Sequence, residues 1–179
     1  MTTPDTTATQ DGLHDLLWRV RLSALYHLKR ERFLDGVDRA SSAITALGGA
    51  AAFASIQNNP DFGQAAAGFI AVVAACSLVY SPATKARRHS ELARDYRLIE
   101  ADAAEETQWS AEKLAKFNSR YSRLEASEPA ALGALVTQCH NELAAALGTN
   151  GHITPLPHHQ RLLKNICDFD QSDLQAPKS

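Results

Sequence analysis

Residues 39–85, RASSAITALGGAAAFASIQNNPDFGQAAAGFIAVVAACSLVYSPATK, decide the fold of this chain. The only charge between the two end residues is Asp61, which separates an uncharged window of 21 residues from one of 23. Each window is long enough to cross a bilayer core of about 30 Å, because an α-helix rises about 1.5 Å per residue. We therefore predict two transmembrane helices, over about residues 40–57 and 63–82.

The segment between the windows predicts a reversal of the chain. Residues 57–63 read QNNPDFG and concentrate residues that favour turns. Pro60 also disfavours a helical conformation at Asn59, the residue before it. The two predicted spans therefore form a helical hairpin.

Basic residues flank the hairpin and are absent from its turn. Residues 12–39 carry six Lys or Arg and residues 85–97 carry five. Since such residues stay on the cytoplasmic side, we predict a protein of the bacterial inner membrane with both termini in the cytoplasm. The residues expected to flank the membrane and contact anionic lipid headgroups are Arg39, Lys85, Arg87 and Arg88.

Two alternatives concern the same segments. Uncharged, Ala-rich helices also form the buried hairpin of a soluble bundle, although a soluble bundle gives no reason for the charge asymmetry. The basic residues 85–89 would also suit nucleic acid, but their position directly after a span favours lipid. We expect no direct nucleic-acid binding.

Amphipathic helices are predicted on both sides of the hairpin. Apolar residues recur at steps of three and four over residues 13–39. Residues 85–125 contain no Gly or Pro and predict one long helix, and Ser127-Glu128-Pro129 resembles the start of a helix over residues 128–147 that Gly148 ends. The fold class is therefore all-α, with cytoplasmic helices that form a bundle.

We expect a disordered N-terminus over residues 1–12 and an irregular tail over 148–179, with residues 161–169 offering one more short helix.

An apolar seam on the long predicted helix indicates an interface. Its residues are Leu92, Tyr96, Ile99, Phe117 and Tyr121. The seam is longer than one short helix folded back on it can cover. We expect these side chains to be buried, partly between the subunits of a homo-oligomer.

Small and hydroxyl-bearing residues share one face of the first predicted span: Ser41, Thr45, Gly48, Ala52 and Ser55. Small side chains let transmembrane helices approach closely, and hydroxyl groups form hydrogen bonds across helices, so one interpretation is helix packing. The other interpretation is the wall of a pore in an oligomer. The spacing leaves both open.

No motif organises a catalytic, cofactor or metal site. The Cys and His residues at 139, 140, 152, 158, 159 and 167 match no compact pattern of zinc ligands, and no nucleophile elbow or phosphate loop is present. We expect no enzymatic activity, no cofactor and no bound metal. The three widely spaced cysteines also argue against a disulfide framework and fit a reducing compartment.

Residues 86–100, ARRHSELARDYRLIE, follow the hairpin directly and are preceded by an Arg-rich helix over residues 18–33. This arrangement resembles the SLATT family, the two-transmembrane effector domains of bacterial anti-phage conflict systems, over about residues 13–147. The resemblance implies a homo-oligomeric effector that opens pores in the inner membrane or otherwise damages it. It also implies control by a nucleotide second messenger or a nucleotidyltransferase-type partner, and it brings no catalytic residues.

Two other functions suit the same pattern. A phage holin-like or superinfection protein would use the same hairpin in its membrane. A soluble helical oligomerisation scaffold would instead keep the hairpin as its own core.

Overall fold

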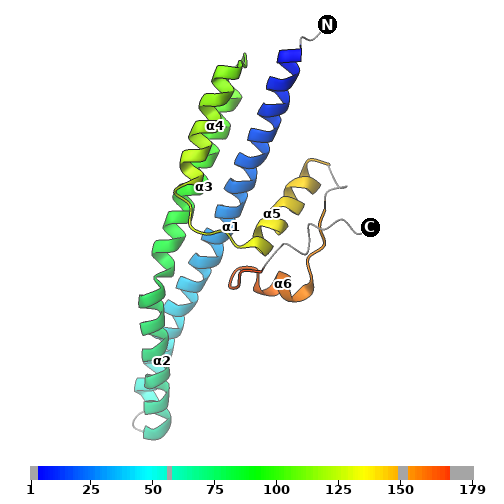
Figure 1. Cartoon of the computed structure of the whole chain (residues 1–179). Coiled ribbons are helices and arrows are strands. Elements are labelled where there is room, and N and C mark those ends of the chain that lie inside the picture. Colours follow the sequence, from blue (N-terminus) through cyan, green and yellow to red (C-terminus); the bar gives the residue numbers. More distant parts are fainter. Residues whose placement is uncertain (1–3, 56–57, 149–152, 170–179) are drawn as a thin grey trace. The chain divides into compact units, whose positions relative to one another are not determined.

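The computed structural model describes residues 4–55, 58–148 and 153–169 of the chain. Every regular element in these ranges is a helix, so the predicted all-α class is confirmed (Figure 1). The chain divides into two compact units. We call residues 30–89 the hairpin unit, and residues 1–29 together with 90–179 the helical unit.

Helix α1, Pro4–Ser55, contributes to both units without interruption. It joins the predicted amphipathic helix and the first predicted span in a single element. It also begins before the predicted start, so the expectation of disorder is wrong for residues 4–12. Gly12 lies close to the Leu114 side chain of the later chain, since a Cβ added at this glycine would be 2.6 Å from it.

Helix α2, Pro60–Tyr80, begins at the reversal that the sequence predicts. The Asn59 side chain accepts a hydrogen bond from the Phe62 N–H at 3.2 Å, and Pro60 occupies the first turn, where its missing N–H costs nothing. The N–H groups of Asn58 and Asn59 both donate to the Ser55 carbonyl. This capping places the start of α2 at Pro60 rather than at residue 63.

Helix α3, Pro82–Glu105, follows α2 after a single residue, Ser81. Ser81 has a left-handed backbone conformation with φ of 49°. A residue before proline avoids the right-handed helical region, which explains why α2 stops here.

The long helix predicted over residues 85–125 is wrong, because α3 ends at Glu105 and α4, Ala111–Glu125, is a separate helix. Ser110 caps α4 by accepting a hydrogen bond from the Lys113 N–H at 3.3 Å. The Lys113 ammonium group pairs with the Glu106 carboxylate and donates to the Gln108 carbonyl, which closes the turn. Two polar positions within the seam, 106 and 110, were the sequence signal for this break.

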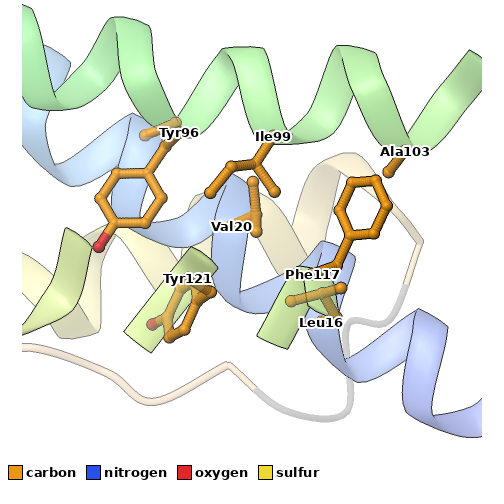
Figure 2. Close-up of a cluster of buried hydrophobic side chains, with 8 residues drawn as sticks. Leu16, Val20, Tyr96, Ile99, Ala103, Phe117 and Tyr121 are labelled. Atoms are coloured by element: carbon orange, nitrogen blue, oxygen red, sulfur yellow. The ribbon is translucent and has the colours of Figure 1, made fainter. Parts of the chain in front are cut away.

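The core of the helical unit lies where α1, α3 and α4 meet. Figure 2 shows Tyr96, Ile99 and Ala103 of α3 facing Phe117 and Tyr121 of α4, with α1 side chains completing the cluster. The α1 residues in this core are Leu16, Val20 and Ala24. The seam on α3 is therefore covered by two helices of its own chain.

Helix α5, Gly133–Ala146, starts five residues after the predicted position. The Ser127 hydroxyl donates to the Leu124 carbonyl at 2.8 Å, so this residue belongs to the turn after α4 and does not cap α5. Tyr26 of α1 accepts a hydrogen bond from the Leu132 N–H at 3.1 Å and packs against Leu135 and Cys139.

The tail contains one short helix, α6, His158–Leu163, which lies slightly before the predicted residues 161–169. Gly148 has a positive φ of 75°, the conformation expected just after a helix end. Two contacts hold the tail against α5. Asn141 exchanges two hydrogen bonds with the Thr154 backbone, and the Asp168 carboxylate accepts one from the Gly133 N–H at 3.0 Å.

Candidate membrane hairpin and the groove between its helices

The hairpin unit exposes many of its apolar residues. Within the described ranges, one helical stretch, Pro60–Glu105, is long and apolar enough to cross a membrane. An 18-residue window of this stretch has a mean hydropathy of 1.9, and 6% of that window is buried. This stretch contains the second predicted span. The first predicted span does not meet this criterion of length and hydropathy, so its insertion into a membrane stays a prediction.

Exposed side chains occur on both helices of the hairpin unit. On α2, Leu78 and Val79 are 80% and 86% exposed, and on α1, Leu47 and Phe53 are 74% and 79% exposed. A helix that packs on a soluble core hides its apolar stripe, whereas the described residues of this chain leave these side chains uncovered. Exposed apolar surfaces of this kind are typical of sites that contact lipid or another protein.

The small face of the first predicted span lies partly against α2. The Ser41 and Ser77 hydroxyl oxygens are 3.1 Å apart, and a Cβ added at Gly48 would lie 3.1 Å from the Ile70 side chain. Ala52 is buried, with 3% of its surface exposed. These contacts give Ser41, Gly48 and Ala52 a role in packing α1 on α2.

An open groove with several hydroxyl groups on a mostly apolar lining runs between the two helices beside this contact. Ser41 and Thr45 line it from α1, and the α2–α3 segment adds Ser77, Ser81 and Thr84. Asp38 is its one charged lining residue. Ser55 lies outside the groove, and its hydroxyl donates to the Ala52 carbonyl at 2.9 Å. The structure thus places Gly48 and Ala52 in the packing contact, Thr45 in the groove, and Ser41 in both.

The basic residues expected beside the membrane lie outside the groove. Arg39 is highly exposed and pairs with Asp35 at 2.8 Å. The Lys85 ammonium group lies 3.5 Å from the centre of the Tyr80 ring. Arg87 and Arg88 are both exposed. All four lie at solvent-facing positions, which suits contact with anionic headgroups.

The five residues of the predicted oligomer seam are all buried in the chain itself. Tyr96 and Ile99 are 0% and 1% exposed, and Leu92, Phe117 and Tyr121 are nearly as well covered. The apolar stripe of α1 provides the cover that we expected partly from a second subunit. What this seam contributes to contacts between subunits stays a prediction.

A buried polar network in the helical unit was missed from the sequence. The Tyr96 hydroxyl donates to the Glu128 carboxylate, and the fully buried His27 places its Nε2 2.9 Å from the same oxygen. The Tyr96 and His27 rings are stacked with centroids 5.8 Å apart. Burial, with Glu128 adding to it, raises the pKa of Tyr96 far above its ordinary value, so the phenol keeps its proton.

A second polar contact holds α5 to α1. The Lys29 ammonium group lies 2.7 Å from the Glu142 carboxylate, which also accepts a hydrogen bond from Gln138. Partial burial acts to raise the pKa of Glu142, but the bonds from Lys29 and Gln138 outweigh it, so the pKa lies below its ordinary value. Glu142 is therefore ionised at neutral pH.

The Cys and His residues do not form a metal centre in the part of the chain that the structure describes, where no group of three or more potential ligands gathers. Cys139 is fully buried, and burial raises the pKa of its thiol to about 12. A thiol in this environment stays protonated and is a poor nucleophile and metal ligand.

Comparison of the chain with protein-family models, with curated proteins and with solved structures gives no match. The resemblance to the SLATT family rests on residues 86–100 and on their place after the hairpin.

Proposed function

We propose that this chain is a non-enzymatic membrane effector whose hairpin unit inserts into the bacterial inner membrane and permeabilises it as part of a homo-oligomer. One observation carries the proposal: the hairpin unit exposes large apolar side chains on both of its helices, and the open groove between these helices carries several hydroxyl groups and one carboxylate on an otherwise apolar lining. A pore-forming hairpin needs both features, an outer surface that lipid solvates and a polar path within the assembly.

The hydroxyl groups of the hairpin support insertion. Ser41, Thr45 and Ser55 each donate to a carbonyl of the preceding helical turn. Bonds of this kind let a moderately polar helix such as the second half of α1 enter a bilayer, where an unsatisfied polar group costs several kcal/mol. A soluble scaffold would have to hide Leu47, Phe53 and the apolar residues of α2 against another protein surface.

The wider role is an anti-phage defence effector, with both termini and the helical unit in the cytoplasm. The resemblance to the SLATT family supports this role, and with it control by a nucleotide second messenger or a nucleotidyltransferase-type partner. A holin-like lysis protein would share the hairpin but would lie beside an endolysin gene instead of a nucleotide-signalling gene.

Substitutions in the groove test the proposal. The double variant Ser41→Leu with Thr45→Leu fills the polar path with apolar side chains. We expect induced expression of the wild-type chain with its neighbouring genes to depolarise bacteria and stop growth, and the double variant to lose both effects. The matched control is Ala43→Leu, which adds the same side chain at an exposed α1 position outside the groove.

Membrane level and oligomer size are measured in parallel for all three proteins. Unchanged toxicity of the double variant would contradict a conducting groove. Extraction of the wild-type chain from membranes without detergent would contradict insertion and would favour the soluble scaffold.

A further inference from the structure

We propose that the tail docks on an anionic membrane surface through a short apolar face on α6 and the turn after it. We call this face, formed by Leu162, Leu163 and Ile166, the tail face. The inference lies outside the hairpin unit and goes beyond the proposed pore. It rests on the proposed insertion of the hairpin, because insertion brings the cytoplasmic tail to a lipid surface.

The tail face belongs to one continuous helical segment. Leu162 and Ile166 are 80% and 67% exposed, and Leu163 is 37% exposed. The N–H groups of Ile166 and Cys167 both donate to the Leu163 carbonyl at 2.9 Å, so the helical turn continues past the end of α6. Residues three and four positions apart share a face of such a turn, which places these three apolar side chains together.

Polar residues of the same segment face the rest of the helical unit, where α6 packs on α5 (Figure 1). The side-chain oxygens of Gln160 and Asn165 are buried. Lys164 is half-buried and lines a pocket together with Asn141 and Glu142 of α5. A helix that covers a water-soluble core has the opposite orientation, with its apolar side inward. The described residues leave the tail face uncovered, as is typical of a site that contacts another surface.

The charges around the tail face favour anionic lipid as that surface. Residues 143–167 contain no Asp or Glu, whereas Arg161 and Lys164 flank the tail face. Arg161 is exposed, and so are His158 and His159. Apolar side chains next to basic ones are the pattern of short segments that lie in the headgroup region of an anionic bilayer. In the proposed topology every copy of the chain has such a surface on the side of its tail.

The test places a fluorescent bimane group on Cys167, which is exposed beside the tail face. The full chain carries Cys76→Ala, and the fully buried Cys139 does not react. The labelled chain is incorporated into nanodiscs of phosphatidylcholine alone or of equal parts phosphatidylcholine and phosphatidylglycerol. We expect lipids with a nitroxide on the acyl chain to quench the label in the anionic discs, and aqueous iodide to lose access to it there.

Two variants separate the apolar and the basic contributions. Leu162→Ser with Ile166→Ser removes the large exposed side chains and should lower the ratio of docked to free tails at least about tenfold. Arg161→Gln should lower this ratio about fivefold in anionic discs, because one cation near an anionic leaflet contributes about 1 kcal/mol and 1.4 kcal/mol is tenfold. The matched control, Leu98→Ser, makes the same change at a 49% exposed position of α3 and should leave the ratio unchanged.

The outcomes distinguish the tail from the hairpin. A chain that enters the discs but whose label is quenched equally by iodide in both lipid compositions would overturn tail docking while insertion stands. Protection from iodide without quenching by the lipid nitroxide would show that protein covers the tail face, and would overturn lipid as its partner. A chain that does not co-purify with the discs would overturn the proposed insertion and tail docking together.

Discussion

At the scale of single residues, the network of Tyr96, His27 and Glu128 links three parts of the helical unit. Tyr96 belongs to α3, His27 to α1, and Glu128 to the turn between α4 and α5. Glu128 is 17% exposed at its side chain, so its charge is only partly solvated and depends on these two partners. The turn before α5 is therefore held by a buried hydrogen bond as well as by apolar packing.

Replacement of Tyr96 by Phe tests this network. The variant keeps the ring in the core but removes the hydroxyl group that donates to Glu128. A hydrogen bond to a charged group contributes about 1.5–3 kcal/mol, and we expect the free energy of unfolding to fall by roughly 2 kcal/mol. The measurement is denaturant unfolding of the full chain in detergent, followed by circular dichroism.

The control for Tyr96→Phe is Tyr80→Phe, because Tyr80 is 43% exposed on α2 and keeps its ring beside Lys85. We expect this control to stay within about 0.5 kcal/mol of the wild type. Equal stability of the two variants would show that the Tyr96 hydroxyl group contributes nothing to the fold.

At the scale of elements, the break between α3 and α4 decides how the helical unit forms its core. Five residues, 106–110, turn the chain so that Phe117 and Tyr121 pack against Ile99 and Tyr96. A continuous helix over residues 85–125 would carry these side chains away from one another. The Ser110 cap and the Glu106–Lys113 pair stabilise the turned form.

Replacement of Ser110 by Ala should destabilise the chain, because the Lys113 N–H loses its acceptor at the start of α4. Loss of such a cap typically costs about 1 kcal/mol. Ser122→Ala is the matched control, since Ser122 is exposed within α4 and Ala favours the helix there. Thermal unfolding should place Ser110→Ala below the wild type and Ser122→Ala at or above it. The reverse order would exclude the capping role.

At the scale of the whole molecule, two helices, α1 and α3, each contribute to both units, and the two units have different surfaces. The helical unit has a buried apolar core and exposes large apolar side chains mainly in its tail, at Leu162 and Ile166, whereas the hairpin unit exposes them along both of its helices. Such a division suits a protein with one part in water and one part in lipid. The proposed topology places the α1–α2 reversal in the periplasm and the α3–α4 turn in the cytoplasm.

Cysteine labelling of intact spheroplasts tests this topology. In a chain whose three native cysteines are replaced by Ala, Asn58→Cys places an exposed thiol at the reversal without removing the Asn59 cap. We expect a membrane-impermeant maleimide to label it from outside. The control, Thr107→Cys in the exposed α3–α4 turn, should react only after lysis. Labelling of both sites only after lysis would contradict the hairpin topology.

Local features of the sequence were sufficient for the all-α class and for where α2 begins and ends. The uncharged windows on either side of Asp61, the Asn59-Pro60 start of α2 and the end of α2 before Pro82 each depend on residues close together in the chain. Their backbone preferences and hydropathy act over a few residues, so they can be interpreted without knowledge of the fold.

Contacts between distant residues were decided only by the tertiary structure. The sequence alone did not show that α1 covers the seam around Tyr96, that Glu128 faces His27, or that Ser41 meets Ser77 across the hairpin. These contacts join residues that are 36 or more positions apart. The periodicity of one helix shows which face is apolar but not which helix covers it, because the free energy of that choice comes from the packing of all the helices together.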